Sequence, residues 1–299
     1  LLYKAVAAAA HLLGGALVLL VARALGASRS QSLASALVFL WNPLLLWEMV
    51  GNGHNDGLMM LGALLAIWLL VRGRQRLALP ALALGALVKP PVVVIAPLLA
   101  LPGWRCRRRE AIEGVCLALL LALILYYPFW RGLDTLTALR RTELFTASLG
   151  SVLRLSLAPS LGLVVASSLA RWTSLAGFGA VAAVALFRTF RARQPREVVG
   201  AAYVTLLAAT LLATTWFQAW YVVWPLALGA ALPDGRRHLE VGLLSLGGLL
   251  QYLVFIYLWV MGVFAPHEDL PVQAGAYLAI VGPLLLGVAL WQRARYARR

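Results

Sequence analysis

The sequence has little charge. Only 12% of its 299 residues are charged, whereas 62% are hydrophobic. A water-soluble domain carries about a quarter charged residues. Because a chain with so little polar material cannot cover a soluble core, lipid must be the solvent for much of its surface. The scarcity of charge therefore excludes a soluble enzyme or binding module and indicates an integral membrane protein.

Cysteine and lysine are scarce as well. Cys106 lies in a basic loop and Cys116 in an apolar stretch, and two such residues predict neither a disulfide framework nor a metal cluster. Lys4 and Lys89 are the only lysines among 26 basic residues, so the net charge of +15 comes from arginine. The arginines gather between apolar blocks, which is typical of the positive-inside rule and argues against a nucleic-acid partner.

What the sequence has in abundance is apolar blocks of about 16–25 residues, and about 20 apolar residues in a helix cross a hydrocarbon core. The alternation of outer-membrane barrel strands is absent. We therefore expect an all-α, polytopic helical membrane protein with about ten spans in a single domain, 1–299. The expected spans are 3–25, 31–50, 58–71, 111–130, 172–189, 198–215, 218–232, 240–264 and 273–291, with 77–101 as the remaining membrane segment.

The segment 77–101 decides the topology. As one straight span it would place the arginine clusters that follow it outside, against the positive-inside rule. Two prolines within a straight helix would break it, whereas proline at a helix start is favoured. We expect a re-entrant hairpin, or two half-length helices, that turns at Lys89-Pro90-Pro91. All arginine clusters then lie in the cytoplasm.

This topology leaves one long external segment, 131–160. Leu133, Leu136 and Leu139 lie at helical spacing among charged residues and predict an amphipathic helix on the membrane surface.

The densest polar group lies at the expected outer end of the spans 31–50 and 58–71. It consists of Glu48, within an apolar run, and the segment Gly51-Asn52-Gly53-His54-Asn55-Asp56-Gly57. Charge at the mouth of a span is costly and therefore points to function. The candidate catalytic residues are Glu48, His54 and Asp56, and the candidate substrate ligands are Asn52 and Asn55. The structural alternative is a polar turn in which Asp56 caps the next helix.

Two further features are expected on the same outer side. Lys89 either snorkels to the interface or supplies a fixed positive charge for an anionic group such as a phosphate. The segment 214–225 either belongs to the interfacial aromatic belt or, through Gln218, Trp220 and Tyr221, binds a sugar. The convergence of the three features predicts a site on this side.

These motifs have a familiar pattern. Trp41-Asn42-Pro43 followed by Gly51–Gly57 resembles the NP…GxxHND signature of bacterial polyprenol-phosphate-dependent glycosyltransferases of the GT-C superfamily. That group includes α-mannosyltransferases and glycosyltransferase family 87. Val88-Lys89-Pro90-Pro91 is similar to their vKxP segment. Gln218-Ala219-Trp220-Tyr221 with Trp224-Pro225 is similar to their QPWYxxWxxP segment, with Ala219 in place of the usual proline. Phe145-Thr146-Ala147-Ser148-Leu149 resembles an external f-N-x-S-l motif but lacks its asparagine.

The resemblance implies a multi-pass enzyme of the bacterial inner membrane. Such an enzyme takes a hexose, most often mannose, from a polyprenyl-phosphate-sugar donor on the outer face and passes it to a lipid or glycan acceptor with inversion. His54 and Asp56 would be acceptor-side or phosphate-side groups, and Lys89 would contact the lipid phosphate. Gln218, Trp220 and Tyr221 would contact the sugar.

The resemblance also bears on where the sequence begins. The family's catalytic carboxylate usually lies in the first external loop, and this sequence begins after that loop. We therefore expect the first span and first loop upstream of Leu1, and Asp56 as a supporting carboxylate.

Two alternatives stay open: a polytopic transporter or lipid flippase, and a catalytically inactive GT-C-like subunit. A transporter should carry ionisable groups near the bilayer midplane, whereas here they gather at one surface, with Arg171 as the main exception. No cofactor is firmly indicated. The segment His267-Glu268-Asp269 is either a divalent-metal site or a solvated loop, and we favour the loop.

Overall fold

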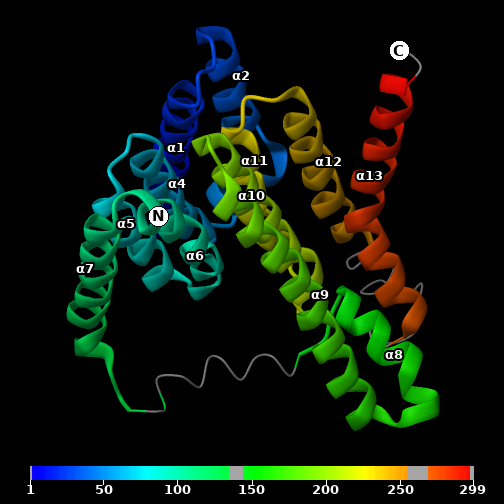
Figure 1. The fold of residues 1–299 in the computed structure, drawn as a ribbon. Coiled ribbons are helices and arrows are strands. Elements are labelled where there is room, and N and C mark those ends of the chain that lie inside the picture. The colour runs from blue at the N-terminus through cyan, green and yellow to red at the C-terminus, as the bar shows by residue number, and fades with distance from the viewer. Residues whose placement is uncertain (1, 133, 135–143, 255–268, 297–299) are drawn as a thin grey trace.

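The computed structural model describes residues 2–132, 134, 144–254 and 269–296. Within these residues the chain is a bundle of helices, with a β-bridge between Thr146 and Trp216. Helices α1 and α4–α7 lie on one side of the bundle in Figure 1, α8, α9, α12 and α13 lie on the other, and α10 and α11 lie between them. The α-helices are α1 (Leu2–Ala24), α2 (Arg29–Leu40), α3 (Pro43–Leu45), α4 (Asp56–Val71), α5 (Gln75–Val88), α6 (Ala96–Cys106), α7 (Arg108–Tyr126), α8 (Leu149–Leu161), α9 (Leu163–Arg191), α10 (Pro195–Ala208), α11 (Val223–Ala231), α12 (Gly235–Tyr252) and α13 (Leu270–Tyr296). Short π-helical segments are η1 (Leu46–Gly51) and η5 (Ala209–Ala213), and short 3₁₀ segments are η2 (Pro90–Ile95), η3 (Tyr127–Phe129) and η6 (Ala219–Val222).

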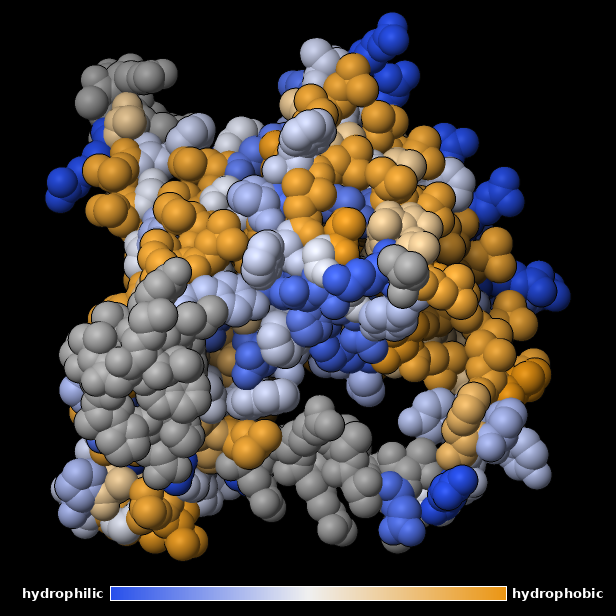
Figure 2. Space-filling model, turned by 180° about the vertical axis from the view of Figure 1, so that it is seen from behind, coloured by the Kyte–Doolittle hydropathy of each residue, from blue (hydrophilic) through white to orange (hydrophobic). Residues whose placement is uncertain are grey.

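Burial is greatest in the middle of the bundle. All nine residues of α11 are buried, and this helix packs against α1, α2, α4, α10 and α12. At the periphery, α7 buries only Ala111 and Gly114 and leaves most of its leucines exposed. Figure 2 shows hydrophobic residues over the flanks of one face and hydrophilic residues gathered in its middle. A helix that is apolar all round is typical of a membrane environment.

The expectation of a helical membrane protein is confirmed, but the expected ten spans are not supported. Among the described residues, five helices are long and apolar enough to cross a membrane, or six if the pair formed by α2 and Pro43–Gly51, bent by 44°, counts as one span. The five are α1, α7 with η3, α9, α10 with η5, and α13. The other apolar helices are too short. The 16 residues of α4, for example, reach about 24 Å, against a hydrocarbon core of about 30 Å.

Two further expectations concern segments that the structure describes only in part. The expected span 240–264 begins within α12, which carries Arg236, Arg237 and Glu240 in its first two turns, and continues past residue 254 outside the described part. The leucines of the expected amphipathic helix in 131–160 likewise lie outside it, whereas the end of that segment forms α8.

The segment 77–101 forms two half-length helices that turn at Lys89-Pro90-Pro91, as its prolines predict. Helix α5 ends at Val88, and α6 follows the 3₁₀ segment η2. The start of α5 packs against α6, because Gln75 Nε2 donates a hydrogen bond of 2.6 Å to the Leu99 carbonyl. The turn of this hairpin therefore presents Lys89 at one end of the bundle.

The arginine-rich segments come together at the opposite end. Arg107 donates to the Gly73 carbonyl at 2.8 Å, and Arg105 donates to the Phe190 carbonyl. Arg196 Nη2 lies 3.6 Å from a carboxylate oxygen of Asp234, at the start of α12. The described loops 72–76, 105–109, 191–196 and 233–237 thus form what we call the arginine-rich end.

Candidate functional site

The path of the chain from α2 to α4 is set by Asn42 and Pro43. The Asn42 side-chain oxygen accepts hydrogen bonds from the backbone of Leu44 and Leu45, each at 3.1 Å, and from the Ser245 hydroxyl of α12 at 2.8 Å. Pro43 occupies the first turn of α3, where its missing N–H costs nothing. The chain therefore bends here and enters the π-helical segment η1. Segments of this kind are frequent at functional sites.

Glu48, in η1, is the centre of the first polar cluster. Its side chain is fully buried. One carboxylate oxygen accepts a hydrogen bond from the Tyr252 hydroxyl of α12, and the other accepts from Asn52 Nδ2 at 3.1 Å. His54 Nε2 lies 3.4 Å from that second oxygen. His54 keeps 29% of its side chain exposed and Asn52 is exposed as well, so a ligand can reach both the imidazole and the amide of this cluster.

Asp56, the first residue of α4, is the centre of the second cluster. Its buried carboxylate accepts two hydrogen bonds of 2.8 Å from Lys89 Nζ and one of 2.6 Å from Trp224 Nε1. The alternative in which Asp56 caps α4 is not observed, since Asn55 occupies the N-cap position and makes no capping side-chain bond. Asp56 thus fixes the position of the Lys89 ammonium, and three of the about four lone-pair sites of its carboxylate are occupied by Lys89 and Trp224.

Close contact between α4 and α5 brings these two residues together. A Cβ atom added at Gly62 would lie 2.6 Å from the Gly85 nitrogen, and one added at Gly85 would lie 2.5 Å from the Met59 carbonyl oxygen. Small residues let membrane helices approach in this way. Since α4 and α5 run antiparallel, the start of α4 meets the end of α5, and Asp56 faces Lys89.

The aromatic segment closes the two clusters from the other side. The His54 ring stacks on Trp220, with centroids 4.0 Å apart and planes 17° apart. Lys89 Nζ lies 4.8 Å from the centroid of the Tyr221 ring. The rings of Trp220 and Tyr221 are 6.0 Å apart and nearly perpendicular, at 85°. Gln218 directly precedes η6, and its side chain makes no capping bond. We call these two clusters with the aromatic residues the polar site.

The segment 144–149 holds the aromatic segment in place. The Thr146 backbone donates to the Thr215 carbonyl and accepts from the Phe217 N–H, both at 2.9 Å. Ala147 adopts a left-handed backbone with φ of 47°, and Gln273 of α13 accepts its N–H. Backbone pairing therefore joins the segment 144–149 to the aromatic segment 214–225.

Arg171, which the sequence singles out, lies outside the polar site. Its guanidinium lies 6.0 Å from the Phe145 ring, and that of Arg154 lies 5.3 Å from the same ring. Neither Nε has a hydrogen-bond partner among the described residues.

Sequence reasoning assigned no site role to three members of the polar site, although Trp224 lies in the segment 214–225 that it singled out. Tyr252 and Trp224 bind the two carboxylates, and Lys4 Nζ donates to the Gly51 carbonyl at 2.6 Å. For Lys4 the available signal was the rarity of lysine in this sequence. Both lysines contact the segment 51–57 in the structure. For Tyr252 no local signal exists, because an isolated tyrosine near a helix end is ordinary in an interfacial belt.

No group of three or more histidine, cysteine, aspartate or glutamate side chains suited to a metal ion occurs among the described residues. His267 and Glu268 lie outside them.

No curated protein sequence matches the chain. Residues 1–104, about a third of the chain, match the model of a family described as alpha-(1->6)-mannopyranosyltransferase, N-terminal domain. The matched segment contains both carboxylates, His54 and Lys89, whereas the aromatic segment lies beyond it. The N-terminal part of this helical membrane protein is thus similar to a mannosyltransferase domain.

Proposed function

We propose that the protein is a membrane glycosyltransferase. It moves a hexose, most simply mannose, from a polyprenyl-phosphate-sugar donor to a lipid or glycan acceptor on the outer face of a bacterial inner membrane. The observation that carries the proposal is the Lys89 ammonium, which is held between Asp56 and Tyr221 beside an imidazole–carboxylate pair. The family match of residues 1–104 supports the same reaction class.

The donor side is built around Lys89. An ammonium has three N–H donors, and Asp56 takes two of them, which leaves one for a phosphate oxygen. A cavity of about 800 Å³ begins at the neighbours of Lys89, Val88 and Pro90, and continues along Tyr126 and Trp130. Such a volume and apolar lining suit part of a lipid chain. A polyprenyl chain lying in this cavity would bring its phosphate to Lys89.

The acceptor side is built around His54. A proton-accepting group that is itself oriented by a buried carboxylate is the usual arrangement of a general base. In the proposed reaction the acceptor oxygen attacks the anomeric carbon while the bond from that carbon to the phosphate oxygen breaks. The hydroxyl proton passes to His54, which Glu48 orients, and the electron pair leaves on the polyprenyl phosphate beside Lys89. The perpendicular rings of Trp220 and Tyr221 form a corner for the apolar face of the sugar.

The proposal assigns different roles to the two carboxylates. Asp56 is buried and bound by Lys89 and Trp224, so in the proposal it positions the phosphate-binding ammonium. Glu48 is fully buried, and in the proposal it acts on the substrate through His54. In the alternative assignment, the general base is a residue upstream of Leu1 and not His54. The transfer assay of a His54 variant distinguishes the two assignments.

The test uses protein in liposomes with radiolabelled polyprenol-phosphate-mannose, and separately the glucose and arabinose analogues, with membrane lipid extract as acceptor. His54→Gln and Lys89→Ala are compared with His238→Gln, which changes a histidine at the arginine-rich end. We expect at least about a hundredfold loss of transfer for His54→Gln, the scale of a general base, and wild-type transfer for His238→Gln. Unchanged transfer in His54→Gln would place the base elsewhere. No transfer from any donor by folded protein would contradict the enzyme and favour a transporter or an inactive subunit.

A further inference from the structure

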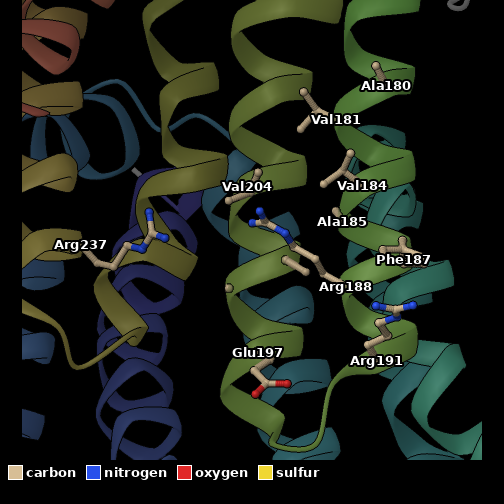
Figure 3. A pocket seen from close by; sticks show the side chains of 12 residues that line it. Ala180, Val181, Val184, Ala185, Phe187, Arg188, Arg191, Glu197, Val204 and Arg237 are labelled. Atoms are coloured by element: carbon tan, nitrogen blue, oxygen red, sulfur yellow. The ribbon is translucent and has the colours of Figure 1, made fainter.

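Another cavity lies at the arginine-rich end, between α9 and α10. It has a volume of about 630 Å³, and no residue of the polar site lines it. Figure 3 shows Val181 and Val184 of α9 facing Val204 of α10. The charged residues of the lining lie toward one end: Arg188, Arg191, Glu197 and Arg237. The cavity is therefore amphiphilic along its length.

The charged end keeps a net positive charge, since it has three arginines and one glutamate in its lining. Arg237 is paired with Glu240, and Glu197 accepts a hydrogen bond of 2.8 Å from the Arg193 backbone N–H before α10. Arg188 extends from α9 toward α10 (Figure 3). Neither Arg188 nor Arg191 forms an ion pair with a carboxylate in the described part of the chain. Glu197 supplies one negative charge at this end, so Arg188 and Arg191 leave an excess of positive charge, which favours a bound anion because planar guanidinium donors match phosphate oxygens.

The dimensions of the cavity fit one leaflet of a bilayer. Arg188 and Ala180 are eight residues apart on α9, so they are about 12 Å apart along the helix axis. One leaflet contributes about half of the hydrocarbon thickness of roughly 30 Å. The cavity thus runs from the headgroup level at Arg188 toward the bilayer midplane at Ala180.

We propose that this groove binds one anionic phospholipid from the leaflet at the arginine-rich end. Arg188 and Arg191 bind the phosphate, and one acyl chain lies along Val181, Val184 and Val204. A soluble anion would leave the apolar walls unused, and a zwitterionic headgroup would bring a cation to the arginines. The inference is independent of the glycosyltransferase proposal, since it uses neither the polar site nor its chemistry.

The first test measures lipid binding to the whole detergent-purified protein by native mass spectrometry. Phosphatidylglycerol is compared with phosphatidylcholine of the same acyl chains and with inorganic phosphate. We expect the double variant Arg188→Gln/Arg191→Gln to bind phosphatidylglycerol about thirtyfold more weakly, since each arginine near a membrane surface contributes about one kilocalorie per mole. Arg72→Gln removes an exposed arginine from the same end but not from the groove, and it should bind like the wild type.

The second test fills the groove without removing charge. A Cβ atom added at Gly200, which lines the groove, meets no atom within 4 Å, and the same holds at Gly179, which does not line it. Gly200→Leu should therefore fold, keep the wild-type melting temperature and lose phosphatidylglycerol binding at least about tenfold. Gly179→Leu is the matched control and should keep it. Equal binding of both phospholipids, or binding that neither groove variant lowers, would overturn the proposal. Displacement of the lipid by inorganic phosphate alone would also overturn it.

Discussion

The ion pair between Asp56 and Lys89 permits a quantitative prediction. Asp56 is fully buried and Lys89 keeps 23% of its side chain exposed, so water screens the pair only weakly. Removal of one partner from a buried ion pair leaves an uncompensated charge and costs about 3–5 kcal/mol of unfolding free energy.

The two single variants should differ in a defined order. In Asp56→Asn the ammonium keeps its contact with the Tyr221 ring, worth about 0.5–1 kcal/mol, so we expect a loss near 3 kcal/mol. In Lys89→Met the buried carboxylate keeps only the Trp224 hydrogen bond, so we expect a loss nearer 5 kcal/mol. The double variant removes both charges, and its loss should be smaller than the sum of the single losses by at least about 2 kcal/mol.

The measurement is reversible unfolding in mixed micelles, followed by tryptophan fluorescence, for the wild type, both single variants and the double variant. The surface pair Arg109–Glu113, with a distance of 3.0 Å, a fully solvated arginine and a half-buried glutamate, serves as the control and should show coupling below about 1 kcal/mol. Losses below about 1 kcal/mol in both single variants, or additive losses in the double variant, would refute the reasoning that this pair is buried and coupled.

Three further predictions concern the framework of the polar site. Gly85→Ala places a methyl group 2.5 Å from the Met59 carbonyl oxygen, so it should destabilise the protein by about 1–3 kcal/mol in the same unfolding assay, whereas Gly179→Ala, in open space, should not. Tyr252→Phe removes a donor from the buried Glu48 and should cost about 1–3 kcal/mol; a neutral result would show that water replaces the hydroxyl. Asn42→Ala removes the cap of α3 and the acceptor of Ser245 and should cost about 1–2 kcal/mol, with Asn42→Asp as the rescue, since an aspartate oxygen accepts the same bonds.

Where the signal was local, the sequence singled out residues that the structure brings together. Glu48, Asp56 and Lys89 stood out because charge in apolar sequence is costly, whatever the fold around it. The turn of α5 and α6 at Pro90 followed from the geometry of proline. These features depend on a few neighbouring residues, so they can be predicted from the sequence alone.

Prediction from the sequence was wrong for the number of spans, because helix lengths and side-chain partners depend on the rest of the chain. The expected span count was too high because apolar blocks such as 56–71 form helices shorter than a bilayer is thick, and packing among α1, α4, α5 and α11 shelters them. A hydropathy pattern does not distinguish such sheltered half-length helices from true spans.

Composition and local pattern alone determined that this is a helical membrane protein with polar residues at one end and arginine at the other. Only the tertiary structure decided which of these polar residues meet. The hydrogen bonds from Trp224 to Asp56 and from Tyr252 to Glu48 join residues 168 and 204 positions apart. Such pairs arise from the packing of α11 and α12 against the loop before α4, and packing of this kind is set by the shapes of many side chains at once.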